Sequence, residues 1–200
     1  MYTPFNAYGG DALLGRDSLR LTRNRLLTRV TAPVAEPVTL SEAKLYLRVD
    51  SSDEDTLIND LITASRLFAE NWLRRSLMSQ SWKIVFDLGV PESVWLPVGP
   101  VVSVASVVVI NQDGSTQTMD SSSYWLNAAQ NAIVMNGMLT GFKIQITYNT
   151  GYGDATAVPK PIKQGMLTHI AAMYDSRGEM GADLPNAAVA LYTPFREVRL

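Results

Sequence analysis

The sequence predicts an α+β fold: a helical core with an antiparallel β-rich insertion and extended arms at both ends of the chain. Two observations carry this prediction. Apolar residues recur at three- and four-residue intervals in the segments before residue 76 and after residue 159, whereas residues 80–150 alternate polar and apolar positions or form β-branched runs. The expected organisation is a basic arm over 1–37, one domain over 38–178 and a tail over 179–200.

The first predicted helix covers about residues 40–48. It follows the sequence Thr-Leu-Ser-Glu at 39–42, which is a capping box: the Thr39 hydroxyl can accept from the amide of Glu42, and the Glu42 carboxylate can reach back to Thr39. The start of this helix is therefore the best-defined boundary in the chain.

The second predicted helix covers about residues 53–75. Ser52 or Asp53 is the expected cap, and the acids at 53–55 lie near the positive end of the helix dipole. Two neighbouring rows of apolar residues give it one broad face: Leu57, Leu61, Ala64, Phe68 and Trp72, beside Ile58, Ile62, Ala69 and Leu73. We expect this face to be buried.

The insertion reads as short strands joined by turns. Residues 80–88 alternate, 101–110 are rich in valine, and Asp113-Gly114 marks a turn before candidate strands at 116–119, 124–127 and 132–135. The last strand precedes Gly151. Helical spacing then returns, which predicts a third helix over about 160–177.

The composition excludes several classes of protein. Hydrophobic residues make up 46% of the chain and charged residues 18%, which is enough apolar content for a packed core. No stretch is long enough to cross a membrane and no secretory signal is evident, so we expect an unexported chain without a membrane partner. The chain has no cysteine, which excludes disulfides, thiolate metal sites and cysteine nucleophiles.

The templates for catalysis and metal binding also fail. His169 is the only histidine and lies on the apolar stripe of a predicted helix, so a packed or interface role is expected rather than catalysis. The acids at 50–55 lack the glycine and bidentate glutamate of a calcium loop. We therefore expect no enzyme activity, no cofactor and no metal; a hydrolase or sugar-binding role has only aromatic and carboxylate content in its favour.

The residues at the two ends of the chain fall in none of the predicted helices or strands, and many of them are charged or aromatic. Residues 1–30 hold five arginines against two aspartates, a net charge of +3. These arginines could contact DNA phosphates or an acidic partner; they are Arg16, Arg20, Arg23, Arg25 and Arg29. The last ten residues mix apolar and basic side chains without a predicted element to pack against.

The order of these segments carries a resemblance to a known family. Residues 37–77 beginning PVTLSEAKLYLRVDSSDEDTL, then WLPVGPVVSVASVVV, ITYNTGYG and VPKPIKQGMLTHIAAMYDSRGE together resemble the head–tail connector (adaptor) proteins of tailed bacteriophages, prophages and gene transfer agents. The resemblance covers about residues 37–178.

The resemblance implies a structural virion protein located in the neck and assembled in the host cytoplasm. Its members form a ring, usually of twelve subunits, below the portal of a DNA-filled head, and they meet a tail-side neck or stopper protein on the other side. The C-terminal tail commonly reaches the portal. By this analogy the portal-binding residues are Leu191, Tyr192, Pro194, Phe195, Arg196 and Arg199. The alternative function is a nucleic-acid-binding accessory protein acting through residues 16–29, and DNA in the lumen is a further implied partner.

Overall fold

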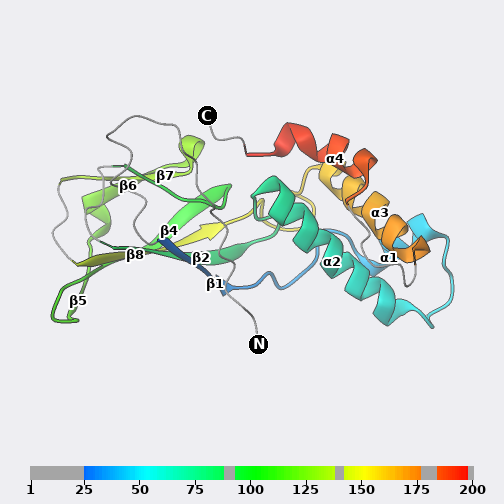
Figure 1. The fold of residues 1–200 in the computed structure, drawn as a ribbon, viewed down its shortest axis with the longest axis horizontal. Helices are drawn as coiled ribbons and strands as arrows, with labels where there is room; N and C mark the ends of the chain where they lie inside the picture. Colours follow the sequence, from blue (N-terminus) through cyan, green and yellow to red (C-terminus); the bar gives the residue numbers. More distant parts are fainter. Residues whose placement is uncertain (1–24, 88–92, 138–141, 177–183, 198–200) are drawn as a thin grey trace. The chain divides into compact units, whose positions relative to one another are not determined.

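The computed structural model describes residues 25–87, 93–137, 142–176 and 184–197, and its elements confirm the α+β class. Four α-helices lie within these residues (Figure 1): α1 (Leu40–Leu47), α2 (Asp55–Leu73), α3 (Lys160–Asp175) and α4 (Asn186–Tyr192). The strands are β1 (Arg25–Thr31), β2 (Gln80–Asp87), β3 (Ser93–Trp95), β4 (Val101–Ile110), β5 (Thr116–Thr118), β6 (Tyr124–Asn127), β7 (Ala132–Met135) and β8 (Lys143–Thr150).

The elements belong to two compact units. The helical unit consists of the described residues within 32–80, 97–100 and 150–197, and the β unit of those within 25–31, 81–96 and 101–149. From the sequence we expect residues 38–178 to form one domain, with helices at both ends and a β-rich segment between them. The chain passes between the units several times, which is why no single linker marks the division in the sequence.

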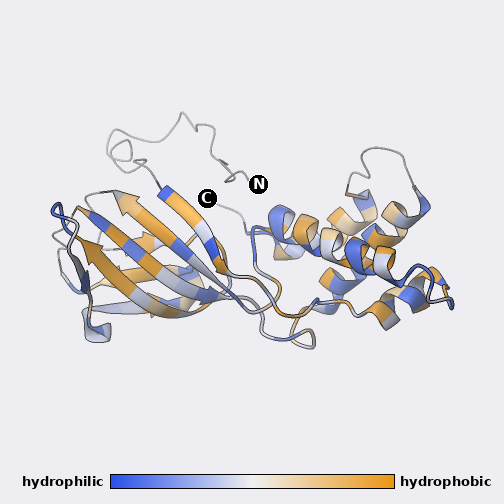
Figure 2. Ribbon diagram, turned by 90° about the horizontal axis from the view of Figure 1, so that it is seen from below, coloured by the Kyte–Doolittle hydropathy of each residue, from blue (hydrophilic) through white to orange (hydrophobic). Residues whose placement is uncertain are grey.

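The β unit contains two antiparallel sheets. The larger sheet has the order β1-β2-β8-β4-β5 and the smaller one β3-β7-β6. Apolar side chains from both sheets form one core, with Ile146 and Tyr148 from the larger sheet and Ile133 from the smaller one completely buried. Figure 2 shows the matching alternation of hydrophobic and hydrophilic residues along the strands.

Residues 25–31 correct the prediction of an arm extending to residue 37. They form β1, which pairs antiparallel with β2 from Arg25 opposite Phe86 to Thr31 opposite Ser81, with an irregularity after Arg29. The alternation in this segment was hidden by its arginines and by the prolines that follow it. Residues 1–24, the rest of the predicted arm, lie outside the described residues.

The helical unit starts with the predicted capping box. The Thr39 hydroxyl accepts from the amide of Glu42, and the Thr39 amide donates to the Glu42 carboxylate at 2.8 Å. The prediction for α2 was less accurate, because its N-cap is Glu54, which makes no side-chain capping bond, rather than Ser52 or Asp53. Asp53 instead accepts a hydrogen bond from the Ser51 hydroxyl at 2.6 Å.

The C-terminal residues correct a second expectation. Instead of a free tail from residue 179, residues 186–192 form α4 and Thr193–Phe195 form a short 3-10 helix. Ala188 and Tyr192 belong to the buried core of the helical unit. Arg177 and the residues up to 183, which include the expected end of the third helix, lie outside the described residues.

Candidate functional site

An apolar stripe on α2 is the most prominent surface of the helical unit. Ile58, Ile62, Ala69 and Leu73 are buried as predicted, but two residues of the neighbouring row are exposed: Phe68 is 48% exposed and Leu57 is 40% exposed. We call the residues Leu57, Asp60, Leu61, Ala64 and Phe68 the α2 stripe. Spacings of three and four residues place all five on one side of the helix. The expectation that the whole broad face is buried is therefore wrong for Leu57 and Phe68, whereas Leu61 and Trp72 pack against the core.

Two polar residues of α2, Ser65 and Arg66, are buried on the side of the helix that faces the core. The Ser65 hydroxyl donates to the carbonyl of Met166 on α3 at 3.1 Å, and the Arg66 guanidinium lies between two carboxylates. A buried arginine requires charged partners and satisfied hydrogen bonds, and these are found on both sides of it. Their positions fix the rotation of α2 and thus the exposure of the α2 stripe.

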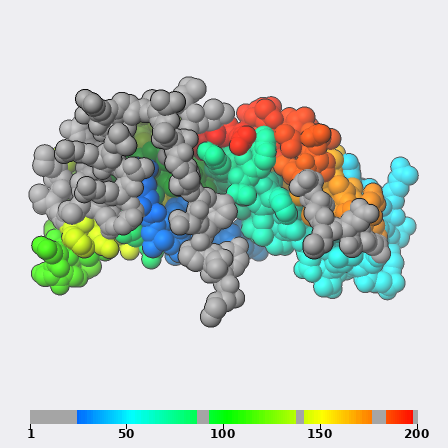
Figure 3. Space-filling model, viewed as in Figure 1, coloured from blue at the N-terminus to red at the C-terminus, as the bar shows by residue number. Residues whose placement is uncertain are grey.

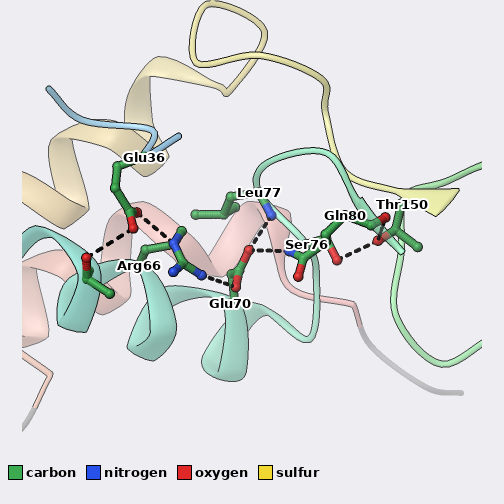
Figure 4. Close-up of polar contacts among 8 residues, drawn as sticks. Glu36, Arg66, Glu70, Ser76, Leu77, Gln80 and Thr150 are labelled. Carbon is green, nitrogen blue, oxygen red and sulfur yellow. Dashed lines mark hydrogen bonds and ion pairs between the residues drawn. The ribbon is translucent and has the colours of Figure 1, made fainter. Parts of the chain in front are cut away.

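The Arg66 network is drawn in Figure 4. Arg66 Nε donates to Glu36 Oε2 at 2.6 Å, and Arg66 Nη1 donates to Glu70 Oε2 at 3.0 Å. The other oxygen of Glu70 accepts from the Leu77 amide at 2.9 Å and from Gln80 Nε2 at 2.7 Å. One buried glutamate therefore connects α2 to the segment that leads into β2.

The electrostatics of this network reflect its burial. Burial raises the pKa of Glu70, although the Leu77 amide, Arg66 and Gln80 act in the opposite direction. Burial alone would lower the pKa of Arg66, but hydrogen bonding to Glu36 and the charge of Glu70 raise it. The network is thus a charged support for the helix, and it offers no open position for a substrate.

The C-terminal segment packs against α2 and α3. The Tyr192 ring occupies the space beside Gly165, where an added Cβ would overlap it, and lies 6.0 Å from the Trp72 ring between centroids. The Arg196 guanidinium lies 4.7 Å from the Trp72 ring centroid, and the Glu197 amide donates to the Leu73 carbonyl at 3.2 Å. Figure 3 shows this segment, in red, on the surface beside the blue-green α2.

The residues that were predicted to bind a portal differ in their exposure to solvent. Tyr192 is completely buried, so it supports the fold and is not accessible to a partner in this conformation. Burial also raises the pKa of Tyr192. Leu191 and Phe195 are partly buried, whereas Pro194 and Arg196 are exposed. Arg199 lies outside the described residues.

Two of the five arginines that were predicted to contact DNA or an acidic partner lie within the described residues. Arg25 and Arg29 are strand residues of β1, and the Arg25 guanidinium lies 5.3 Å from the Phe86 ring centroid. Arg16, Arg20 and Arg23 lie outside the described residues. The candidate contact is therefore partly a sheet edge, a feature that the arginine spacing does not reveal.

His169 occupies the core of the helical unit. It is completely buried on α3, and its ring meets the Phe68 ring edge-on with 5.1 Å between centroids. Within the described parts of the chain, no group of three or more acidic or histidine side chains could hold a metal ion. None of the described helices is long and apolar enough to cross a membrane.

The fold resembles solved structures of phage-like particles. One is described as the neck of an empty gene transfer agent particle computed with C6 symmetry; it is 23% identical, has a TM-score of 0.73, and the match covers 87% of this chain and 96% of that one. A chain from the virion of a native gene transfer agent is 21% identical with a TM-score of 0.74, covering 88% and 97%. A chain from the native neck computed with C12 symmetry is 23% identical with a TM-score of 0.68, covering 87% and 96%. These likenesses show a shared fold.

The sequence comparison finds similarity to one family. No curated protein matches the chain. Residues 37–133 match the sequence model described as the phage gp6-like head–tail connector protein, a structural family rather than an enzymatic one. The matched segment begins just before the capping box of α1 and continues through α2 into the β unit. Over residues 37–133, the chain is therefore similar to the gp6-like head–tail connector family.

Proposed function

We propose that this protein is a neck subunit that assembles into a ring below the portal and joins the head of a phage-like particle to its tail. The match of residues 37–133 to the connector family carries this proposal. A ring subunit needs no titratable catalytic site. It does need extensive surfaces for contacts with its neighbours, and the α2 stripe is such a surface.

Ring assembly is supported by the structural neighbours and by the chemistry of α2. The neighbours come from particle necks described with C6 and C12 symmetry, which favours twelve copies here. A closed ring uses heterologous contacts, in which one surface of each subunit meets a different surface of the next. An exposed row with two large apolar side chains fits one half of such a contact.

Contact with the portal through the C-terminal end is the second part of the proposal. Pro194 and Arg196 are its accessible candidates among the described residues, together with Arg199 beyond them. Tyr192, Phe195 and the Trp72–Arg196 contact hold this end of the chain against the helical unit. The opposite side of the ring would then receive a tail-side neck protein.

Native mass spectrometry over a range of concentrations, with and without a portal ring, tests the proposal. We expect a closed species of about twelve subunits, alone or on the portal. Deletion of residues 198–200 removes Arg199 but retains Tyr192, so it should weaken portal binding while the fold remains intact, as judged by circular dichroism. A chain that stays monomeric and ignores the portal would contradict the ring. Unchanged portal binding by the deletion variant would contradict the assigned role of Arg199.

A further inference from the structure

The β unit has an exposed apolar surface on two strands that are far apart in sequence. In the β1–β2 ladder, Leu26 lies opposite Val85 and Thr28 lies opposite Lys83. These four residues share one face, because Leu27 and Ile84 between them contribute to the core on the other side. We call this surface the β1–β2 outer face.

The β1–β2 outer face has the features of a contact surface. Leu26 is 56% exposed, and it lies on the strand at the edge of the larger sheet. A large apolar side chain on the solvent side of an edge strand is unusual, because edge strands generally carry charge or proline to prevent association. The charged residue among the four is Lys83, which lies in the middle of the ladder.

The α2 stripe has the complementary character. Leu57 and Phe68 are the exposed apolar side chains, Leu61 between them is partly buried, and Asp60 lies on the same side of the helix. Asp60 is exposed in the chain. The stripe is thus apolar with a negative charge, whereas the β1–β2 outer face is apolar with a positive charge.

We propose that the α2 stripe of one copy packs on the β1–β2 outer face of the next copy, with Asp60 beside Lys83. This inference rests on the proposed ring and identifies the two surfaces that form it. The surfaces are different, as a heterologous contact requires, and repetition of the same contact around the ring uses both surfaces of every copy. Opposite charges at the centre of the contact would fix its register.

The same observations argue against nucleic acid as the occupant of either surface. The α2 stripe presents a carboxylate, which repels phosphate. The β1–β2 outer face presents Leu26 and Val85 beside one lysine, and nucleic-acid backbones are held by clusters of cations rather than by aliphatic side chains. A second copy of this chain satisfies both the apolar and the charged groups.

The absence of cysteine from the sequence makes a direct test possible. We would mix a chain carrying Asp60→Cys with a chain carrying Lys83→Cys, under mild oxidation and conditions in which the wild type forms rings, alone or on a portal. We expect a covalent heterodimer as the main product on a non-reducing gel. A matched control replaces Asp60→Cys with Asp175→Cys, since Asp175 is an exposed acid at the end of α3. This control should give little heterodimer.

Charge reversal gives a second, independent measurement. Asp60→Lys alone and Lys83→Glu alone should each raise the concentration for half-maximal assembly by at least about tenfold, because like charges then meet in the contact. Both substitutions in one chain should restore most of the assembly. Asp175→Lys, with the same change of charge elsewhere, should assemble like the wild type.

The outcomes distinguish this interface from the ring itself. Rings that form without the heterodimer, or that tolerate both single reversals, would overturn the α2–β1–β2 contact and leave the ring intact. Cross-linked homodimers of either variant as the main product would indicate a two-fold contact and also overturn it. Binding of a short duplex DNA that is lost in the Lys83→Glu chain, without the heterodimer, would assign the outer face to nucleic acid. A wild type that never forms a ring would overturn the proposed function and this inference together.

Discussion

The helical unit and the β unit stabilise their cores in different ways. In the helical unit, the buried polar side chains among the described residues are Ser65, Arg66, Ser76, Gln80, Thr150 and His169. In the described part of the β unit, the buried polar side chain is Asn131. The β core is held by apolar side chains from two sheets, whereas the helical core also depends on specific polar partners.

Because of this difference, we expect the helical core to depend more strongly on particular side chains than the β core does. Apolar burial is non-directional, so a sandwich can form from any correct alternation of side chains. A buried charge is stable only with its partners in place. The Arg66 network therefore imposes one rotation on α2, and the exposed α2 stripe is its consequence.

The largest effect is expected where the helical core depends most on charge. Glu70→Ala removes a partner of Arg66 and the shared acceptor of the Leu77 amide and Gln80. Breaking a buried pair in this way costs about 3–5 kcal/mol of unfolding free energy. We expect denaturant titration to show this loss and hydrogen exchange to locate it in α2 and α3, with the strands β4 and β8 still protected.

Two control variants help to interpret the effect of Glu70→Ala. Glu70→Gln retains an acceptor oxygen and the side-chain volume, so its cost should be smaller. Asp175→Ala, an exposed position on α3, should change stability by less than about 0.5 kcal/mol. If Glu70→Ala lowers the free energy of unfolding by less than about 1 kcal/mol, the helical core does not depend on the Arg66 network. The same conclusion would follow if both units lost hydrogen-exchange protection equally.

The same contrast determines how much of the fold could be predicted. The strands at 124–127 and 132–135 were predicted with the bounds that the structure shows, as short strands that follow the turn at Asp113-Gly114. On α2, the spacing of apolar residues alone does not determine which of the two adjacent apolar rows is buried more deeply. Burial of Ser65 and Arg66 made the choice, and it depends on Glu36, which is 30 residues away from Arg66.

The remaining errors have a similar cause. β1 is a strand because of its pairing with β2, about 50 residues later, and nothing local in its arginine-rich sequence shows that partner. α4 has only seven residues, too few for a clear helical period, and its burial depends on the space that Gly165 leaves for Tyr192. The exposure of the α2 stripe and the existence of the β1–β2 outer face were therefore not predicted, because both depend on contacts between residues far apart in the sequence.

A smaller effect is expected from the buried polar residue of the β unit. Asn131 Oδ1 accepts from the Val101 amide at 2.9 Å, and its backbone carbonyl accepts from the Leu96 amide at 2.7 Å. Asn131→Ala removes the first bond and leaves a buried amide without its acceptor, at a cost of about 1–3 kcal/mol. Hydrogen exchange should show the loss at Val101 and in β3 and β7, with α2 unchanged.

The backbone at Asn131 requires a separate control, because its φ is 48°, in the left-handed region. Asn131→Gly accepts this conformation without strain but also loses the side-chain acceptor. We expect Asn131→Gly to be destabilised as well, though less than Asn131→Ala. Wild-type stability of Asn131→Gly would mean that the hydrogen bond contributes little and that the β core does not depend on its buried polar group.

The smallest effect is a pH dependence at the α1–α3 contact of the helical unit. Partial burial tends to raise the pKa of Glu42, but hydrogen bonds from Lys163 and Thr39 outweigh this effect, so the pKa of Glu42 lies below the usual value for a glutamate, 4.5. Lys163 Nζ donates to Glu42 Oε1 at 2.8 Å. Below pH 4.5 the unfolded chain binds this proton more readily than the folded one, so stability falls as the pH decreases through the pKa of the folded state.

Glu42→Gln tests this assignment, because glutamine can keep the capping box but cannot titrate. The variant should be slightly less stable than the wild type at pH 7, and its stability should fall less steeply below pH 4.5. Asp113→Asn is the matched control in the β unit, where hydrogen bonds from Ser115 lower the pKa of an exposed turn carboxylate. If loss of protection in α1 on acidification is the same in Glu42→Gln as in the wild type, the Glu42–Lys163 contact is not its cause.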